Sequence, residues 1–220
     1  NLANVNTAGF KKGRAEFQDL MYRTARAAGA PVNTGSTTPV GMQIGNGVRS
    51  VAISRIFSQG DFQQTENPYD LTVEGEGFFQ VQLPDGTTAY TRDGTFKVDS
   101  QGQLVTSEGY LLQPNITVPE NARDITVSGE GMVTATIDGN AAQLGEVQIA
   151  RFVNPAGLTA MGQNLFRPTE ASGAPIVSAP GVEGMGRILQ GYVESSNVRV
   201  IEEMVNLIVA QRAYEANSKS

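Results

Sequence analysis

The pattern of hydrophobic and polar residues is helical only towards the two ends of the chain. At the C-terminal end, apolar residues recur between Val198 and Val209 and cover an arc of about 200° when placed at 100° per residue. A helix that packs on a single core has an apolar stripe nearer about 100° wide. We therefore predict a helix that begins after an N-cap at Ser196 or Asn197 and packs against more than one neighbour.

Four apolar residues of this segment have the spacing of a coiled-coil seam, namely Val198, Ile201, Val205 and Ile208. One alternative is a helix buried in the chain's own core, but the middle of the chain offers few helical segments as partners. If the helix instead packs in an assembly, its apolar side chains are expected to be exposed in an isolated monomer.

The N-terminal end is also predicted to be helical, in two pieces separated by a break at Gly9, which can adopt a left-handed cap. In the second piece, Arg14–Tyr22, the apolar Phe17, Leu20 and Met21 have helical spacing. The chain begins without Met, and its last helix has no terminator. We therefore expect both terminal helices to continue in a longer protein.

Glycines divide the middle of the chain into short segments, because Gly86, Gly94, Gly102 and Gly109 recur every seven or eight residues. Two of them follow Asp, and Asp-Gly is a strong hairpin signal. An antiparallel meander is predicted, with strands at Phe78–Leu83, Thr88–Thr91, Phe96–Val98, Gln103–Thr106 and Tyr110–Gln113. Further strands are predicted at Ile125–Val127, Val133–Ile137 and Val147–Phe152.

Between the N-terminal end and this meander the chain changes character twice. Residues 26–43 are small, polar and rich in Pro and Gly, which predicts a flexible loop, and Gly47–Phe57 alternates like an extended strand. The fold class is therefore mainly β, with a β-rich central domain flanked by N- and C-terminal helical segments that pack together. We place a terminal helical and extended region at residues 1–70 plus 186–220 and an outer β domain at residues 71–185.

The composition excludes several classes of function. The 220 residues include 25 Gly but no Cys, His or Trp, which removes disulfides, thiol nucleophiles, Cys/His zinc sites and imidazole bases. The net charge is −6 and no basic stripe is present, which disfavours a nucleic-acid partner. No apolar run approaches the length of about 18 residues that predicts a transmembrane helix.

Carboxylates cluster at Asp61, Glu66, Asp70, Glu74 and Glu76. A catalytic pair needs two carboxyl groups in different environments, whereas these residues lie among Gln, Asn and Gly and indicate a solvated surface. No catalytic residue, cofactor or metal site is predicted, and we expect a protein that is not an enzyme.

The two ends of the chain carry paired motifs. The N-terminal motif is Asn1-Leu2-Ala3-Asn4 followed by Asn6-Thr7-x-Gly9-Phe10-Lys11, and the C-terminal motif runs from Gly191 to Asn217. The middle adds Gly75-x-Gly77-Phe78-Phe79 and Tyr90-Thr91-Arg92-Asp93-Gly94. Over nearly its whole length the chain resembles the bacterial flagellar rod and hook family.

This resemblance implies that residues of the two end motifs mediate assembly. They are Asn1, Leu2, Ala3, Asn4, Asn6, Thr7, Gly9, Phe10, Val198, Ile201, Met204, Val205, Ile208, Gln211, Arg212 and Tyr214.

Within the family, the segment Tyr22–Val40 is similar to that of the distal-rod type, a loop rich in Gly, Pro, Ser and Thr that includes Tyr22, Pro31, Gly35 and Pro39. A proximal rod or hook protein is the alternative within the family. An alternative of another class is a secreted β-domain that binds a ligand and oligomerises through its terminal helices.

For a distal-rod subunit the resemblance implies helical self-assembly into a hollow drive shaft that spans the periplasm. The shaft transmits torque and passes exported subunits of the flagellar type III system. The implied partners are copies of the same chain, the neighbouring proximal rod and hook proteins, and outer ring proteins around the rod. We further expect the Tyr22–Val40 loop and the Gly47–Phe57 strand to bridge neighbouring subunits.

Overall fold

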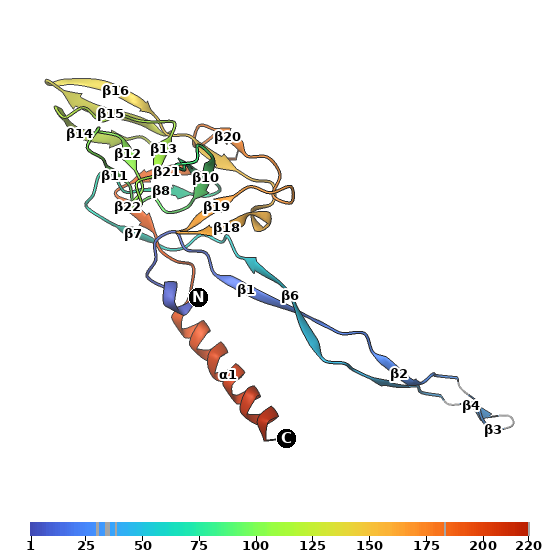
Figure 1. Cartoon of the computed structure of the whole chain (residues 1–220). Helices are drawn as coiled ribbons and strands as arrows, with labels where there is room; N and C mark the ends of the chain where they lie inside the picture. Colours follow the sequence, from blue (N-terminus) through green and yellow to red (C-terminus); the bar gives the residue numbers. More distant parts are fainter. Residues whose placement is uncertain (30, 34–35, 38, 183, 220) are drawn as a thin grey trace. The chain divides into compact units, whose positions relative to one another are not determined.

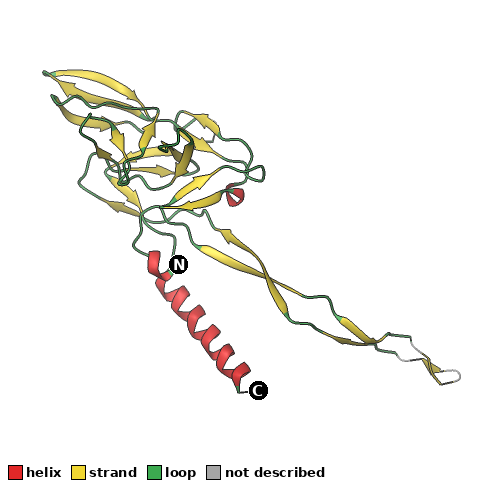
Figure 2. Ribbon diagram, in the orientation of Figure 1, coloured by secondary structure: helices red, strands yellow, loops and turns green. Residues whose placement is uncertain are grey.

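The computed structural model describes residues 1–29, 31–33, 36–37, 39–182 and 184–219. It is mainly β, as predicted from the sequence, and its sheets are antiparallel (Figures 1 and 2). Among the described residues the one α-helix is α1, Val200–Ser218, and two short 3-10 turns lie at Leu2–Asn4 and Pro155–Gly157.

The chain divides into two compact units. The first, called the core unit below, contains Asn1–Lys12 and Ile56–Ser220. The second, called the ribbon unit, is Gly13–Arg55.

The ribbon unit consists of strands paired two by two. Strand β1 pairs with β6, β2 with β5, and β3 with β4. The strands are β1 (Gly13–Asp19), β2 (Arg23–Arg26), β3 (Pro31–Asn33), β4 (Ser36–Thr37), β5 (Met42–Ile44) and β6 (Val48–Arg55). The extended strand expected within Gly47–Phe57 is confirmed as β6, whereas the loop expected at residues 26–43 is wrong in part because it contains β3, β4 and β5.

The predicted N-terminal helix is wrong. Leu2–Asn4 forms a single 3-10 turn, and most of Arg14–Tyr22 lies in strand β1, which pairs with β6 along its whole length. A short segment with three apolar residues gains little from helix propensity alone, because helix nucleation is costly. The long-range ladder satisfies the backbone instead, and it places Ala15 opposite Ile53 on one face of the pair.

The core unit is built around a nine-stranded sheet. Its main order is β11-β12-β13-β9-β10-β19-β18, and β17 pairs with both β9 and β20. The strands are β9 (Phe78–Gln82), β10 (Thr88–Thr91), β11 (Lys97–Val98), β12 (Leu104–Val105), β13 (Leu111–Gln113), β17 (Ile149–Arg151), β18 (Thr159–Gly162), β19 (Leu165–Arg167) and β20 (Ile176–Ser178).

The strands predicted in the meander are present, but one pairing differs. Strand β10 pairs with β9 and β19 and not with β11, so the turn at Gly94 is not a hairpin. The Asp93 carboxylate accepts hydrogen bonds from the amide and hydroxyl of Thr95, and the Leu71 amide donates to the Gly94 carbonyl. The chain at Gly94 therefore packs on Leu71.

Smaller sheets complete the core unit. Strands β14 (Ala122–Val127), β15 (Met132–Ile137) and β16 (Asn140–Glu146) form a three-stranded sheet. Two further pairs join β8 (Leu71–Glu74) to β21 (Arg187–Gln190) and β7 (Phe62–Gln64) to β22 (Tyr192–Glu194). These last two pairs connect the segment before the sheet with the segment that leads into α1.

Two hydrophobic clusters fill the core unit. The larger one contains Phe79, Phe96 and Ile149, and the rings of Phe79 and Phe96 meet edge to face with centroids 5.2 Å apart. The second cluster is aromatic and joins Phe78 to Phe152. Edge-to-face pairs of this kind add about 0.5–1.5 kcal/mol each beyond the burial of their area.

Candidate functional site at the junction of the chain ends

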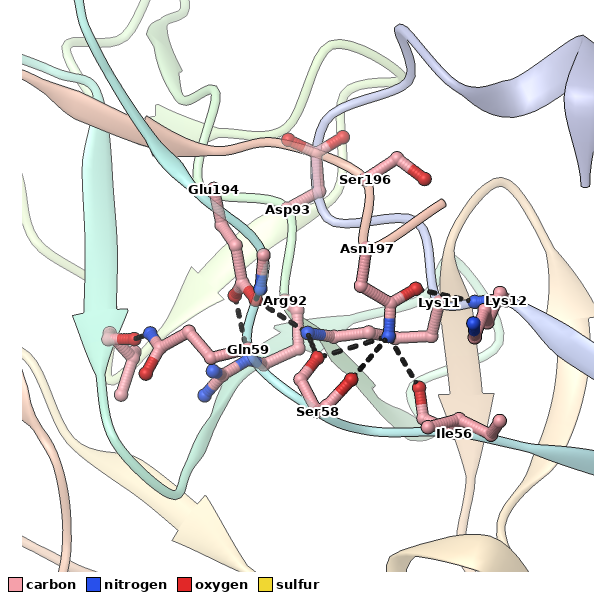
Figure 3. A network of polar contacts seen from close by, with 12 residues as sticks. Lys11, Lys12, Ile56, Ser58, Gln59, Arg92, Asp93, Glu194, Ser196 and Asn197 are labelled. Atoms are coloured by element: carbon pink, nitrogen blue, oxygen red, sulfur yellow. Dashed lines mark hydrogen bonds and ion pairs between the residues drawn. The ribbon is translucent and has the colours of Figure 1, made fainter. Parts of the chain in front are cut away.

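A buried ionic network joins the N-terminal motif, the middle motif and the C-terminal motif (Figure 3). Glu194 on β22 is at its centre: one carboxylate oxygen accepts a hydrogen bond from the Lys11 ammonium and the other accepts from Arg92 at 3.0 Å. The Gly60 amide donates a third hydrogen bond, at 2.9 Å. The motifs that are distant in the sequence therefore meet at a single carboxylate.

The charges of this network are almost fully removed from water. The side chains of Lys11 and Glu194 are each 1% exposed, and that of Arg92 is 5% exposed. Burial lowers the pKa of Lys11, an effect that the neighbouring Glu194 charge opposes and the Arg92 charge reinforces. Both cations also bond to backbone carbonyls, because Lys11 donates to Ser58 at 2.8 Å and Arg92 donates to Gly75 at 2.9 Å.

Gly9 allows the N-terminal motif to approach the middle motif. Its φ is +67°, and a Cβ atom there would lie 2.5 Å from the Asp93 backbone nitrogen. The Gly9 amide donates to the Glu194 carbonyl at 2.8 Å, and the Asn164 side chain donates to the carbonyl of Ala8 at 3.0 Å. Only glycine combines this backbone angle with this contact distance.

Asn197 fixes the segment that precedes α1. Its side-chain oxygen accepts from the Lys12 amide at 2.7 Å, and its side-chain nitrogen donates to the carbonyls of Ile56 at 2.8 Å and Ser58 at 3.1 Å. Figure 3 shows these contacts beside the ionic network. Asn197 thus joins the N-terminal segment and the segment before α1 to residues 56–58 of the core unit.

Helix α1 begins later than the sequence predicts. Its N-cap residue is Arg199, without a side-chain cap hydrogen bond, so the expected caps at Ser196 and Asn197 are wrong. The physical reason is that the side-chain amide of Asn197 donates its hydrogen bond to the Ile56 carbonyl. The Ser196 hydroxyl accepts a hydrogen bond from the amide of Val198, before the helix starts.

The described residues of α1 bury no side chain. Ile201 is 79% exposed, and the other apolar residues of the arc are between 48% and 60% exposed, namely Met204, Val205, Leu207, Ile208 and Val209. Val198, just before the helix, is 6% exposed. The alternative of a helix buried in the chain's own core is therefore wrong, and the exposure expected for an assembly helix is found. Within the described part of the chain, no helix is both long and apolar enough to cross a bilayer.

The remaining predicted assembly residues fall into two groups. On α1, Gln211, Arg212 and Tyr214 are exposed. At the N-terminal end, Asn1, Leu2, Ala3 and Asn6 are exposed, and Asn4, Thr7 and Phe10 are partly buried. Asn1 donates a hydrogen bond to Glu203 of α1 at 3.2 Å, which brings the N-terminus to the first turns of the helix.

The predicted loop residues lie in the ribbon unit. Tyr22 and Pro39 are exposed. Gly35 lies outside the described residues, as does the side chain of Pro31. The interpretation of these residues as a distal-rod signature rests on the sequence.

Sequence reasoning missed the ionic network itself. Lys11, Arg92 and Glu194 each belong to a recognised motif, yet none was predicted to be buried or to contact the others. A signal was present for two of them, because Lys11 follows Phe10 and Glu194 follows Val193. A buried charge needs a partner, so the two end motifs were candidates for contact.

Two family models match the chain. One describes the flagellar hook protein FlgE/F/G D1 domain and matches residues 72–135, and the other describes the flagellar basal body rod FlgEFG protein C-terminal region and matches residues 189–220. The second match contains Glu194, Asn197 and all of the described residues of α1. Both family models thus describe axial proteins of the bacterial flagellum.

Similar proteins identify the flagellar protein family to which the chain belongs. The chain is 54% identical to the flagellar basal-body rod protein FlgG of Borreliella burgdorferi and 50% identical to that of Caulobacter vibrioides, covering all of this chain and 84% and 85% of the relatives. Identity to the flagellar basal-body rod protein FlgF of Caulobacter vibrioides is 35%, over all of this chain and 82% of the relative. The chain belongs to the flagellar basal-body rod protein FlgG family and is a structural subunit of the rod. The resemblance to the distal-rod type is confirmed.

Proposed function

We propose that copies of this chain stack helically into the hollow distal part of the rod, with α1 and the N-terminal segment facing neighbouring copies. The shaft transmits torque across the periplasm and passes exported subunits through its bore. In this arrangement residues 1–70 plus 186–220 form the inner region and residues 71–185 the outer domain. The end motifs, from Asn1 to Phe10 and from Val198 to Tyr214, supply the assembly contacts.

The exposed apolar arc of α1 carries this proposal. Six apolar side chains between Ile201 and Val209 are at least 48% exposed, on a helix that has no partner helix among the described residues. Contiguous exposed apolar surface of this kind marks an interaction site. Contacts between different surfaces of identical subunits produce open helical filaments when the rotation does not close. A rod is such a filament.

We infer that the ribbon unit also bridges copies. An isolated two-stranded sheet is at best marginally stable in water, yet Phe17 and Ile53 of β1 and β6 are 68% and 76% exposed. Coverage by a neighbouring copy would remove these side chains from water. If deletion of Thr34–Pro39 left rod assembly and stiffness unchanged, this role of the ribbon unit would be wrong.

Further partners follow from the same position in the flagellum. The proximal rod adjoins one end of the distal rod and the hook adjoins the other, so both would contact terminal copies of this chain. Outer ring proteins would surround the shaft. Export by the flagellar type III system delivers the subunits to the growing end.

Two neighbouring positions on α1 test the assembly role. Val205→Asp places a carboxylate on the apolar arc, whereas the matched control Asn206→Asp places one on the polar side of the same turn. Both positions are exposed in the isolated chain, so both variants should fold like the wild type. In cells that lack the native rod subunit, we expect Asn206→Asp to restore rods seen by electron microscopy and Val205→Asp to abolish them. Normal rods from Val205→Asp would contradict the proposal.

A further inference from the structure

The charges of the chain are divided unevenly between its two units. The ribbon unit contains five arginines against the carboxylates of Glu16 and Asp19, and so carries +3. Because the whole chain carries −6, the core unit carries −9. Core units of adjacent copies therefore repel one another, and the ribbon unit is the cationic part of the molecule.

Three arginines of the ribbon unit are available to a partner. Arg23 and Arg26 on β2 and Arg49 on β6 are exposed, and none of the three has an ion pair within the described part of the chain. Strand β5, which pairs with β2, adds the apolar side chains of Met42 and Ile44, each 52% exposed. Cations beside exposed apolar side chains are the composition of a protein-docking surface.

The opposite charge is concentrated on the three-stranded sheet of the core unit. Residues 120–146 contain five carboxylates and one arginine, Arg123. All five carboxylates are exposed, and none is in an ion pair with another described residue: Glu120, Asp124, Glu130, Asp138 and Glu146. Asp124 on β14 and Glu146 on β16 lie on the three-stranded sheet, and Glu120, Glu130 and Asp138 lie in the turns that precede or join its strands.

We propose that the ribbon unit of one copy docks, through Arg23, Arg26 and Arg49, on the acidic sheet β14–β15–β16 of a second copy. This inference rests on the proposed bridging role of the ribbon unit and names the surface that receives it. The docking converts the repulsion between core units into attraction, because each ribbon unit supplies cations to the next copy. Complementary surfaces also select the register of the contact.

The absence of cysteine from the sequence makes a crosslinking test specific. Full-length protein with Thr24→Cys in β2 and Gln143→Cys in β16 is assembled into rods and treated with a short bismaleimide. We expect crosslinked dimers and higher oligomers on a denaturing gel, and fewer of them when assembly takes place at 0.5 M salt, since salt screens exposed charges. The control pair, Thr24→Cys with Gln101→Cys, tests a turn outside the acidic sheet.

Charge reversal provides the second part of the test. An exposed ion pair that changes an equilibrium by about twofold to fivefold is lost at each position, so Arg23→Glu, Arg26→Glu and Arg49→Glu together should lower the crosslinked fraction about tenfold or more. Reversal on the sheet, with Asp124→Lys, Glu130→Lys and Glu146→Lys, should restore crosslinking in the combined variant. The core unit of each variant is checked by its thermal melting.

Each outcome separates this inference from the proposed function. If rods form but the crosslinks join two cysteines of the same copy, the proposed docking surface is wrong. The same holds if the control pair crosslinks as much as the test pair. In both cases the rod role of the protein would stand. Crosslinking that is insensitive to charge reversal would overturn the electrostatic basis. Binding of the ribbon unit to anionic vesicles in preference to a second copy would also overturn it. Failure of the wild-type protein to form rods would overturn the proposed function itself.

Discussion

Glu194 lies between Lys11 and Arg92, and each of its carboxylate oxygens accepts a hydrogen bond from one of the two cations. Lys11 belongs to the N-terminal motif, and Glu194 of the C-terminal motif is 183 positions further along the sequence. Their contact closes the chain ends onto the core unit at the start of the segment that leads to α1. The segment that leads into α1 is therefore anchored by a buried ion pair.

We predict that Glu194→Gln strongly destabilises the core unit. The substitution keeps the shape of the side chain but leaves two buried cations without an anion, and breaking a buried pair in this way costs about 3–5 kcal/mol. Urea unfolding followed by circular dichroism measures the loss. The matched control is Glu202→Gln, because Glu202 pairs with Lys12 and Arg199 at the surface, where a pair contributes about 0–1 kcal/mol. Equal losses for the two variants would refute the role of Glu194.

Gly9→Ala should destabilise the protein more than an alanine at another left-handed glycine. A left-handed backbone costs an L-residue about 1–2 kcal/mol, and at Gly9 the new Cβ must also displace backbone atoms of Arg92 and Asp93. We expect a total loss of about 2–5 kcal/mol when an overpacking cost of about 1–3 kcal/mol is included. Gly86→Ala is the control, since Gly86 has φ +82° but no atom within 4 Å of its Cβ position. If both variants had the same unfolding midpoint in urea, the close approach of Gly9 to Asp93 would contribute nothing to the loss of stability.

Thr72→Val should raise the free energy of unfolding. Thr72 on β8 is 0% exposed, and its hydroxyl has no hydrogen-bond partner among the described residues. Valine has nearly the same shape without the unsatisfied hydroxyl, so the expected gain is about 1 kcal/mol. Thr91→Val is the matched control: Thr91 is 1% exposed, but its hydroxyl accepts from the Asp93 amide, so valine there should destabilise. A loss of stability in Thr72→Val would show that an unseen partner holds the hydroxyl.

The sequence allowed the strands of the central sheet to be predicted because Asp-Gly and Gly turns delimit them locally. Thr88–Thr91 has the predicted bounds, and the other predicted strands overlap observed ones. Pairings between distant segments could not be predicted in the same way. The spacing of Phe17, Leu20 and Met21 suggested a helix, but the partner that makes β1 a strand is β6, whose Ser50 pairs with Phe17 from 33 positions further along the sequence.

The site shows the same division. The exposed apolar arc of α1 follows from local periodicity and was predicted. The buried network could not be predicted in detail, because the contact of Lys11 with Glu194 depends on the fold of the whole core unit. The N-cap prediction failed for a related reason. Asn197 is a residue type that often caps helices, but its side chain is hydrogen-bonded to Lys12 and Ile56 instead.

Hydrogen exchange should distinguish α1 in the free chain from α1 in the rod. Most of the stability of a protein helix comes from packing of its apolar face, and α1 has no buried side chain to provide it. We therefore expect the amides of Met204–Ala213 to exchange almost as fast as unstructured amides in the monomer. In assembled rods, burial of the apolar arc against other copies should slow the exchange of the same amides by at least about a hundredfold.

The amides of β9 provide the internal control for this measurement. Phe79 and Val81 are both 0% exposed in the centre of the nine-stranded sheet, so their exchange should be slow in both states and should not change on assembly. Mass spectrometry of peptides from Phe78–Gln82 and from α1, in the same sample, gives both values. Fast exchange of α1 in rods would mean that another surface makes the contacts between copies. Slow exchange of α1 in the monomer would mean that the helix is stabilised by the rest of its own chain.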